Sequence, residues 1–421
     1  MRFMRVPCII FFILWATALR LSAQDFSFNC SKDTSISGCA SDPCITLRTR
    51  IPDLRASGSE YRVSLAGAAS AGCVPRYNDP ATGGVSSNLT ADDTYSQVID
   101  IGFTFPFYGS NYSQLVVSSN GAISFDISRA GQAAHYGILR NGNVLNGEAG
   151  DYEDLPSFLY DPSQIMGVYH DMDITIRNTG ARRISYETAG IAPNRKFIVS
   201  FHNVTLYGEG CEDLFNHSSQ IVLNEATGIV EVLMRGKENC KEWNRQGAMI
   251  GMQNQTADKA IMAPGRRASD SPWGNPGLSE AWRFVPSAGS SLFKRAELYV
   301  LGATAPIATV TTLPAPGADA DMEIAFPDIC PPAGTTTTYI IKSVYASFFD
   351  ASVETAGFDT IRVTRSAASD LGITATATAS DCSSSGNGTI TASVPAGNGS
   401  GNYQYSIVSA AGPWQTSPVF K

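Results

Sequence analysis

The chain has 421 residues, of which 43% are apolar, 10% aromatic and 16% charged, and its net charge is −8. This length and apolar content predict several folded domains and exclude a mainly disordered chain. No run of Lys or Arg follows the N-terminus, which argues against nucleic acid and anionic membrane surfaces as main partners.

Residues 1–23 have the features of a secretory signal peptide. Arg2 and Arg5 precede an apolar run from Val6 to Leu19, and Ala23 offers a small residue before a cleavage point. A run of this length is shorter than the roughly 20 residues needed to cross a bilayer. We therefore expect export through the secretion machinery, a secreted or cell-surface location, and no membrane span.

Eight cysteines remain after the signal peptide, and an even number in an exported chain predicts disulfides. Cys211 and Cys240 flank an apparent hairpin, so we expect them to pair. The other disulfide candidates crowd together near the N-terminus and are expected to pair among themselves: Cys30, Cys39, Cys44 and Cys73. The partners of Cys330 and Cys382 are left open. A zinc site is disfavoured because the sequence has no Cys-x-x-Cys pair.

Short apolar or alternating runs broken by Gly, Asn, Asp and Pro predict an all-β fold of tandem β-sandwich modules. In chain order, the expected strands are 97–107, 115–118, 122–125, 165–169, 183–186, 196–201, 220–223, 229–234, 248–253, 281–285, 296–301, 322–326, 338–344, 358–364, 373–379, 388–394 and 403–408. Asn120-Gly121 is a strong signal for a tight hairpin between the second and third of them, because both residues tolerate positive φ.

Composition shifts divide the chain into five parts. They are a signal peptide (1–23), a cysteine-rich segment (24–75), a large β domain (76–288), a small Ig-like β-sandwich (292–365) and a partial module (371–421). The Pro, Ser and Gly stretch at 286–291 is expected to be a linker. The sequence stops at Lys421 before the last part has enough strands to bury a face, so we expect further domains downstream.

Several segments of the large domain resemble the extracellular nidogen-like (NIDO-type) domain. They are Val98 to Phe103 with Phe107-Tyr108-Gly109, the hairpin from Val117 to Gly121, and Tyr169-His170-Asp171-Met172-Asp173. The stretches Gly251 to Asn254, Ala263 to Arg266 and Glu280 to Phe284 look like the form of that domain found in secreted proteins of Bacteroidota. The C-terminal residues from Gly397 to Phe420 are similar to one SprB-type gliding-motility repeat.

The resemblance implies a surface-displayed protein of adhesion or gliding motility. Proteins of this kind are exported by type IX secretion and belong to the gliding motility-associated C-terminal family. This functional expectation rests on the family resemblance alone, because no particular residue of the sequence indicates it.

Motif searches indicate no enzyme: the sequence has no Gly-x-Ser-x-Gly elbow, no His-Glu-x-x-His and no phosphate-binding glycine loop. The best candidate metal site is Asp171 with Asp173, whose carboxylates at i and i+2 would project from one strand face and could bind Ca²⁺. Alternatively, these acids pair with arginines such as Arg182 and Arg183 or cap turns. No other cofactor is expected.

Aromatic residues beside turns could form an exposed platform that contacts an extracellular glycan or protein ligand. The candidates are Tyr108, Tyr112, Trp243 and Trp273. The alternative is that they belong to the core, as most sandwich aromatics do. We therefore expect a non-enzymatic, modular contact protein; the alternative is a set of carbohydrate-binding modules of a larger secreted polysaccharide-degrading enzyme.

Overall fold

The computed structural model describes residues 34–36, 44–67, 77, 84–140, 151–175, 184–214, 216–241, 243–313, 321–366, 372–379, 387–396, 402–408 and 412–421. Their regular structure is almost entirely β-strand, with three short 3-10 turns at Ile127–Arg129, Asn244–Gln246 and Ala268–Asp270. The all-β prediction is confirmed. Among these residues, no helix has the length and apolar character needed to span a bilayer. The expected signal peptide lies outside them.

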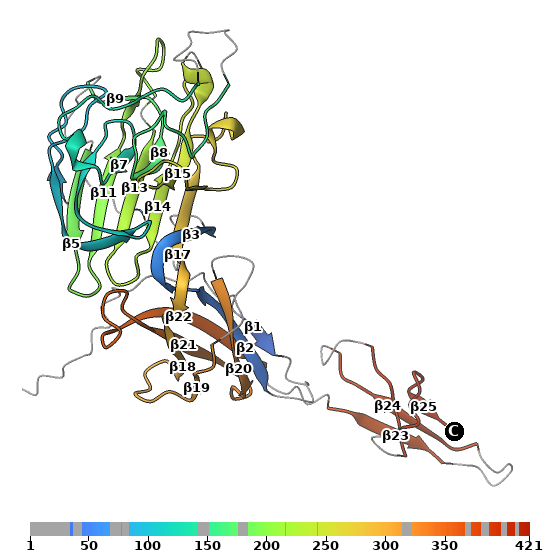
Figure 1. The fold of residues 1–421 in the computed structure, drawn as a ribbon. Coiled ribbons are helices and arrows are strands. Elements are labelled where there is room, and N and C mark those ends of the chain that lie inside the picture. The colour runs from blue at the N-terminus through green and yellow to red at the C-terminus, as the bar shows by residue number, and fades with distance from the viewer. Residues whose placement is uncertain are drawn as a thin grey trace, which may run out of the picture.

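The large sandwich consists of two antiparallel sheets (Figure 1). The seven-stranded sheet has the order β3 (Arg55–Gly67), β17 (Ser279–Ser291), β14 (Val230–Arg235), β13 (Ser218–Asn224), β11 (Lys196–His202), β10 (Ile184–Ala189) and β4 (Val85–Ser86). The six-stranded sheet has the order β16 (Ala260–Met262), β15 (Met249–Gln253), β8 (Gln164–Tyr169), β7 (Ala122–Ser124), β6 (Ser110–Val117) and β5 (Ile99–Phe107). One apolar core draws residues from both sheets.

Alternation along the strands fixes which side chains enter this core, because successive residues of a strand point to opposite faces. Phe103, Phe105 and Phe107 of β5 are all buried in it, as the sequence pattern predicts. On the outer face of the seven-stranded sheet, Glu231 pairs with Arg283, Nε to Oε1 at 3.2 Å, and both side chains are 1% exposed. Each charge is compensated by its partner, because burial of an unpaired charge would cost too much desolvation energy.

The hairpin between β6 and β7 turns at Asn120-Gly121, as predicted. Gly121 has a φ of +77°, and a Cβ at this position would lie 1.8 Å from the carbonyl oxygen of Val168. Only glycine fits, because the backbone of β8 approaches the turn too closely for a side chain.

The small sandwich combines strands from both ends of the chain. Its five-stranded sheet has the order β1 (Thr34–Ile36), β22 (Glu354–Arg365), β21 (Thr335–Ala346), β18 (Phe293–Val300) and β19 (Ala308–Val310). Its two-stranded sheet pairs β2 (Ile45–Pro52) with β20 (Asp321–Ile329). The sequence analysis places β2 in a separate cysteine-rich segment, whereas here its Leu47 and Ile51 lie in the core of the small sandwich.

The two sandwiches are joined by strands rather than by a linker. The expected linker at 286–291 is instead the end of β17, which pairs with β3 across Pro286, Ala288 and Ser291. Val285 and Ile229, both from strands or turns of the large sandwich, lie in the core of the small one. The backbone N–H of Phe348 also donates to the carbonyl oxygen of Ala226 at 2.9 Å. The junction is therefore hydrogen-bonded and apolar.

A third, small sheet contains β23 (Thr374–Thr378), β24 (Thr389–Ser393) and β25 (Val419–Phe420), at the red end of Figure 1. All five residues of β23 are exposed. The strand predicted at 403–408 is not a strand; Tyr405 forms only an isolated bridge with Gln415. Extra Ser, Ala and Gly residues around it supply little apolar surface to hold a strand in place.

Two disulfides lie within the described ranges. Cys211 pairs with Cys240, as predicted. Cys44 pairs with Cys330, so its predicted pairing within the N-terminal group is wrong. The reason is that β2 belongs to the small sandwich and brings Cys44 to the end of β20. The other candidates, Cys30, Cys39 and Cys73, lie outside the described residues, as does Cys382.

Candidate functional site

The most unusual polar groups of the described chain gather where β8 ends. Beyond it, His170 and Asp171 lead into β9 (Met172–Asp173), which pairs with β12 (Thr205–Leu206). His170 is 4% exposed and Asp171 6%. The indole Nε1–H of Trp243 donates to Oδ2 of Asp171 at 2.5 Å, while Oδ1 of Asp171 is buried without a hydrogen-bond partner. The carboxylate is therefore held in place but only half satisfied.

Four carboxylates interact electrostatically around this point, and we call them the acidic cluster: Asp92, Asp93, Asp171 and Asp173. Burial raises the pKa of Asp171 to about 8, although the Trp243 hydrogen bond lowers it. Burial and the charge of Asp93 raise the pKa of Asp92 to about 7. The pKa of Asp93 is also raised by burial, against the effect of a hydrogen bond from Asn120. Burial is the largest cause of the raised pKa at Asp92, Asp93 and Asp171, and repulsion between neighbouring carboxylates adds to it.

Three basic residues are buried next to Asp171 at the end of β8, and we call them the basic cluster: His170, His217 and Lys237. The Nε2 atoms of His170 and His217 are 3.2 Å apart, and His217 and Lys237 are 0% and 1% exposed. Burial lowers the pKa of His217 to about 3 and that of His170 well below its usual value. Burial, aided by the charge of Arg266, lowers the pKa of Lys237 to about 7. Both imidazoles are thus neutral in the folded protein at pH 7.

Lys237 is held between polar and aromatic partners. Its ammonium donates to Oδ1 of Asn239 and lies 4.9 Å from the centre of the Trp273 ring. The guanidinium of Arg266 also lies 4.9 Å from that ring. Cation–π attraction compensates part of the cost of burying two cations next to each other.

The pocket at this point is too small for a substrate. Its volume is about 10 Å³, and His170, Asp171, Lys237 and Trp243 are among the residues that line it. A volume of this size holds about one water molecule, whereas ligand pockets usually measure about 300 Å³ or more. Perturbed pKa values often mark active sites, but here His170, Asp171, His217 and Lys237 are all buried, whereas Asp92 and Asp93 are half-buried.

Asp171 and Asp173, the predicted calcium ligands, are close enough to influence each other but have different partners. Asp173 Oδ1 accepts hydrogen bonds from the N–H and the hydroxyl of Thr175, at 2.7 and 2.6 Å. Across the part of the chain that the structure describes, no three His, Cys, Asp or Glu side chains form a group that could hold a metal ion. The alternative partners Arg182 and Arg183 lie outside the described residues.

The four predicted platform aromatics do not form an exposed surface, and that expectation is wrong. Tyr108 and Trp273 are 8% and 7% exposed, and the Trp273 indole donates to the carbonyl oxygen of Ala248 at 2.9 Å. Tyr112 stacks on Phe125 with ring centroids 4.7 Å apart. The half-buried Trp243 is held by Asp171. Neighbouring turn residues therefore do not by themselves indicate that an aromatic side chain is exposed.

The sequence analysis missed the basic cluster. His170 stands in a quoted segment, but His217 and Lys237 come from other parts of the chain. No motif connects the three residues. Only the strand order, which brings β8 over β13 and β14, places them together.

Comparison with known proteins supports the assignment of the large sandwich. Residues 69–272 match a family model described as NIDO related. That range contains the acidic cluster, the basic cluster and the Cys211–Cys240 disulfide. The comparison with curated proteins gave no match. Nor did the comparison with solved structures.

Proposed function

We propose that this protein is a non-enzymatic, extracellular contact protein, displayed at the cell surface for adhesion or gliding motility. The NIDO-related domain and two disulfides are consistent with an extracellular protein. In this proposal the chain is exported by type IX secretion in a member of the Bacteroidota. Its C-terminal module is a SprB-type repeat, and its ligand is an extracellular glycan or protein.

The small pocket at the end of β8, lined by His170, Asp171 and Lys237, is the observation that carries the proposal. Titratable groups of the kind that enzymes use are present at His170, Asp171 and Lys237, yet the space beside them admits only about one water molecule. A hydrolase needs its acid and base within hydrogen-bonding reach of a substrate. These groups therefore fit a structural role better than a catalytic one.

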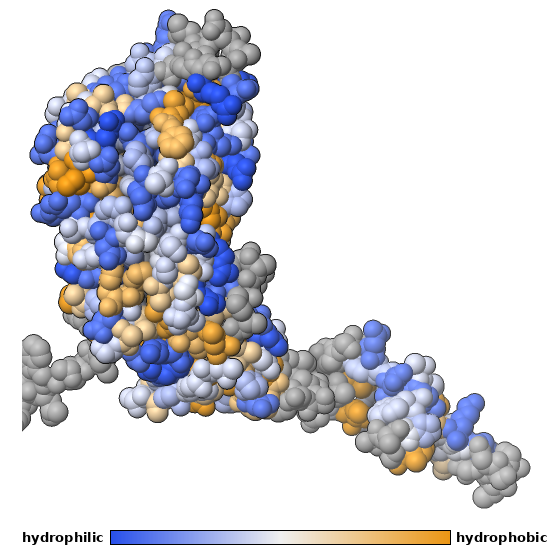
Figure 2. Space-filling view, viewed as in Figure 1, coloured by the Kyte–Doolittle hydropathy of each residue, from blue (hydrophilic) through white to orange (hydrophobic). Residues whose placement is uncertain are grey.

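The face shown in Figure 2 favours weak, repeated contacts over one strong contact, because its apolar residues are interspersed with polar ones. A large continuous apolar patch would favour a tight protein complex. Many copies of a weak contact on one surface add avidity without any strong individual site.

Bead adhesion under flow tests the proposal. The full chain, attached to beads through a C-terminal tag, is passed over surfaces coated with mucin, chitin, cellulose or gelatin. We expect retention that increases steeply with the density of the chain on the bead. The same retention is expected for Gly210→Ala, because a Cβ at Gly210 meets nothing within 4 Å. It should be lost for Gly121→Ala, which disrupts the large sandwich.

Two results would contradict the proposal. Absence of retention on every surface at the highest density removes the adhesive role. Release of soluble sugars or peptides from the same surfaces, in proportion to protein concentration, shows an enzyme.

A further inference from the structure

The order of strands along the chain makes the large sandwich an insertion within the small one. The chain enters the small sandwich at β1 and β2, leaves on β3, forms the large sandwich, and returns on β17 to begin β18. The segments that lead to the two ends of the chain, before β2 and after β22, are therefore both attached to the small sandwich.

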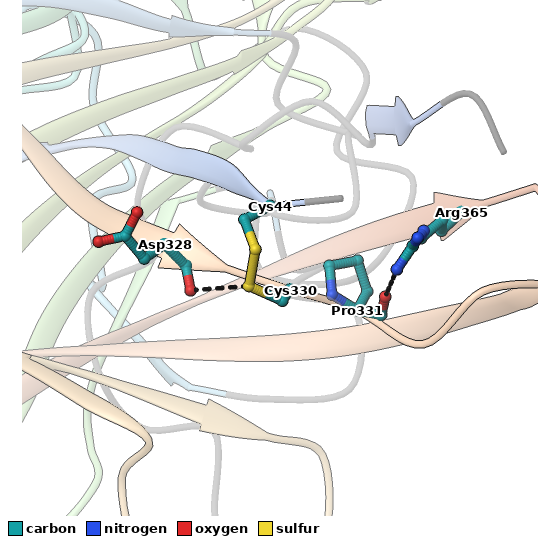
Figure 3. Close-up of a disulfide and its surroundings, with 5 residues drawn as sticks. All are labelled: Cys44, Asp328, Cys330, Pro331 and Arg365. Carbon is teal, nitrogen blue, oxygen red and sulfur yellow. Dashed lines mark hydrogen bonds between the residues drawn. A yellow bond between two sulfur atoms is a disulfide. The ribbon is translucent and has the colours of Figure 1, made fainter. Parts of the chain in front are cut away.

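The Cys44–Cys330 disulfide closes this insertion. Cys44 directly precedes β2 and Cys330 directly follows β20, and their sequence separation is 286 residues (Figure 3). Every strand of the large sandwich, from β3 to β17, lies within that covalent loop. After Cys330 the chain forms β21 and β22 of the small sandwich and then continues to the small sheet of β23, β24 and β25.

The exit of the chain lies beside the same disulfide. Arg365, the last residue of β22, donates from Nη1 to the carbonyl oxygen of Pro331 at 3.0 Å, one residue after Cys330 (Figure 3). β1 also lies along β22 in parallel, with Thr34 opposite Val363 and Ile36 opposite Arg365. A force that separates the two ends of the chain shears this parallel pair, so all hydrogen bonds between β1 and β22 resist it at the same time.

We propose that the Cys44–Cys330 disulfide keeps the NIDO-related domain outside the path of tension along the chain. A force applied to the two ends passes from Cys44 through the disulfide to Cys330, and then through β21 and β22. Covalent bonds carry it past the loop, so the large sandwich keeps its fold while its neighbours extend. The inference rests on the proposed function for its purpose, because a contact domain on a moving surface must stay folded under load.

The expected size of the effect follows from the length of the loop. An extended chain spans about 3.5 Å per residue, so 286 residues correspond to about 1,000 Å of hidden length. With the disulfide intact, the segment from Cys330 to Lys421 can release only about 320 Å. The two values differ about threefold, well within the resolution of single-molecule pulling.

Optical-tweezer pulling of the full mature chain, with handles at both ends, tests the proposal without any ligand. We expect oxidised wild type to extend by no more than about 400 Å, including slack N-terminal to Cys44. The double variant Cys44→Ser/Cys330→Ser should add about 1,000 Å. The matched control Cys211→Ser/Cys240→Ser, which removes the other disulfide, should extend no further than wild type. If the first double variant fails to fold, oxidised wild type reduced after folding replaces it.

An extension of about 1,000 Å by oxidised wild type would overturn the proposal. So would an unchanged extension after loss of the Cys44–Cys330 disulfide. The pulling experiment and the bead assay test the two proposals separately. A chain that adheres to the surfaces but extends fully refutes the tension path alone. A chain that resists extension but never adheres refutes the contact function alone.

Discussion

Replacement of Asp171 with asparagine should make the protein more stable at neutral and alkaline pH. The wild-type carboxyl is 6% exposed, it lies among three other carboxylates, and its pKa is raised to about 8 by burial. Asparagine has the same shape, cannot ionise, and keeps an oxygen that accepts the hydrogen bond from Trp243. The substitution therefore removes a buried charge with little change in packing.

The magnitude follows from proton linkage. In the unfolded chain the pKa of Asp171 is near 3.8, so between about pH 4 and pH 8 this carboxyl holds about one proton in the folded protein and almost none in the unfolded chain. Over that range Asp171 alone lowers the stability of the wild type by about 1.4 kcal/mol for each unit by which pH rises. The stability gain of Asp171→Asn should thus grow from near zero at pH 4 to about 5 kcal/mol at pH 8, and stay constant above it.

Urea unfolding at unit intervals from pH 4 to pH 9, in EDTA, measures the difference. His217 and Lys237 also titrate in both proteins. Asp92 and Asp93 interact with Asp171, so the comparison measures the loss of the Asp171 carboxyl together with its repulsion from these two acids. Asp350→Asn is the control, because Asp350 is exposed and its pKa is lowered by hydrogen bonds from Ser352, so its loss should give no gain at alkaline pH. A variant that is equal to or less stable than wild type at pH 8 would refute the reasoning.

Three further predictions concern the large sandwich. Gly121→Ala should lower the free energy of unfolding by about 3 kcal/mol or more, because the new Cβ would meet the Val168 carbonyl. Gly210 has a similar φ of +74° but open space around it, so Gly210→Ala should lower the free energy of unfolding by only about 1 kcal/mol. Equal losses in urea unfolding would show that φ alone determines the cost. Replacement of Cys211 and Cys240 by alanine should cost about 3 to 4 kcal/mol, since the bond closes a loop with a separation of 29 residues, and calorimetry showing no fall in Tm would contradict this. Calcium at 2 mM and EDTA should give the same Tm, because Trp243 already donates to Asp171 and Thr175 already donates to Asp173. A rise in Tm with calcium that Asp171→Asn abolishes would instead support a calcium site.

Local patterns in the sequence predicted many strands from β5 onward, whereas β2 and β3 were not predicted. The alternation of phenylalanines in β5 and the Asn120-Gly121 turn are properties of a few neighbouring residues, and both are confirmed. The Cys211–Cys240 pair was also predictable because the hairpin between the two cysteines is local. These features need no knowledge of distant segments.

Features that depend on distant contacts were not predictable in the same way. The pairing of β2 with β20 joins residues almost 280 positions apart. The sequence therefore predicted a small sandwich at 292–365 but neither the part that β2 takes in it nor the Cys44–Cys330 bond. The stretch at 286–291 has the composition of a linker, yet pairing with β3 holds it as a strand. Tertiary contacts overrode local preference there.

The candidate site was only partly predictable for the same reason. Asp171 was singled out as a possible calcium ligand, and its burial and its hydrogen bond with Trp243 were not predicted. The aromatic residues near turns were judged by their neighbours in sequence, whereas burial depends on the opposite sheet. The His170–His217 contact links two strands whose neighbourhood the sequence does not reveal.

The long strands β3 and β17 have a practical consequence for recombinant fragments of this protein. A fragment cut at the boundaries of the family match, 69–272, would lack both strands and leave the edge of β14 bare. It would also lose Trp282 and Phe284 from the core. Boundaries chosen for expression should follow hydrogen-bonded sheets rather than sequence similarity, and here they fall before Thr34, which begins β1, and after Arg365, which ends β22.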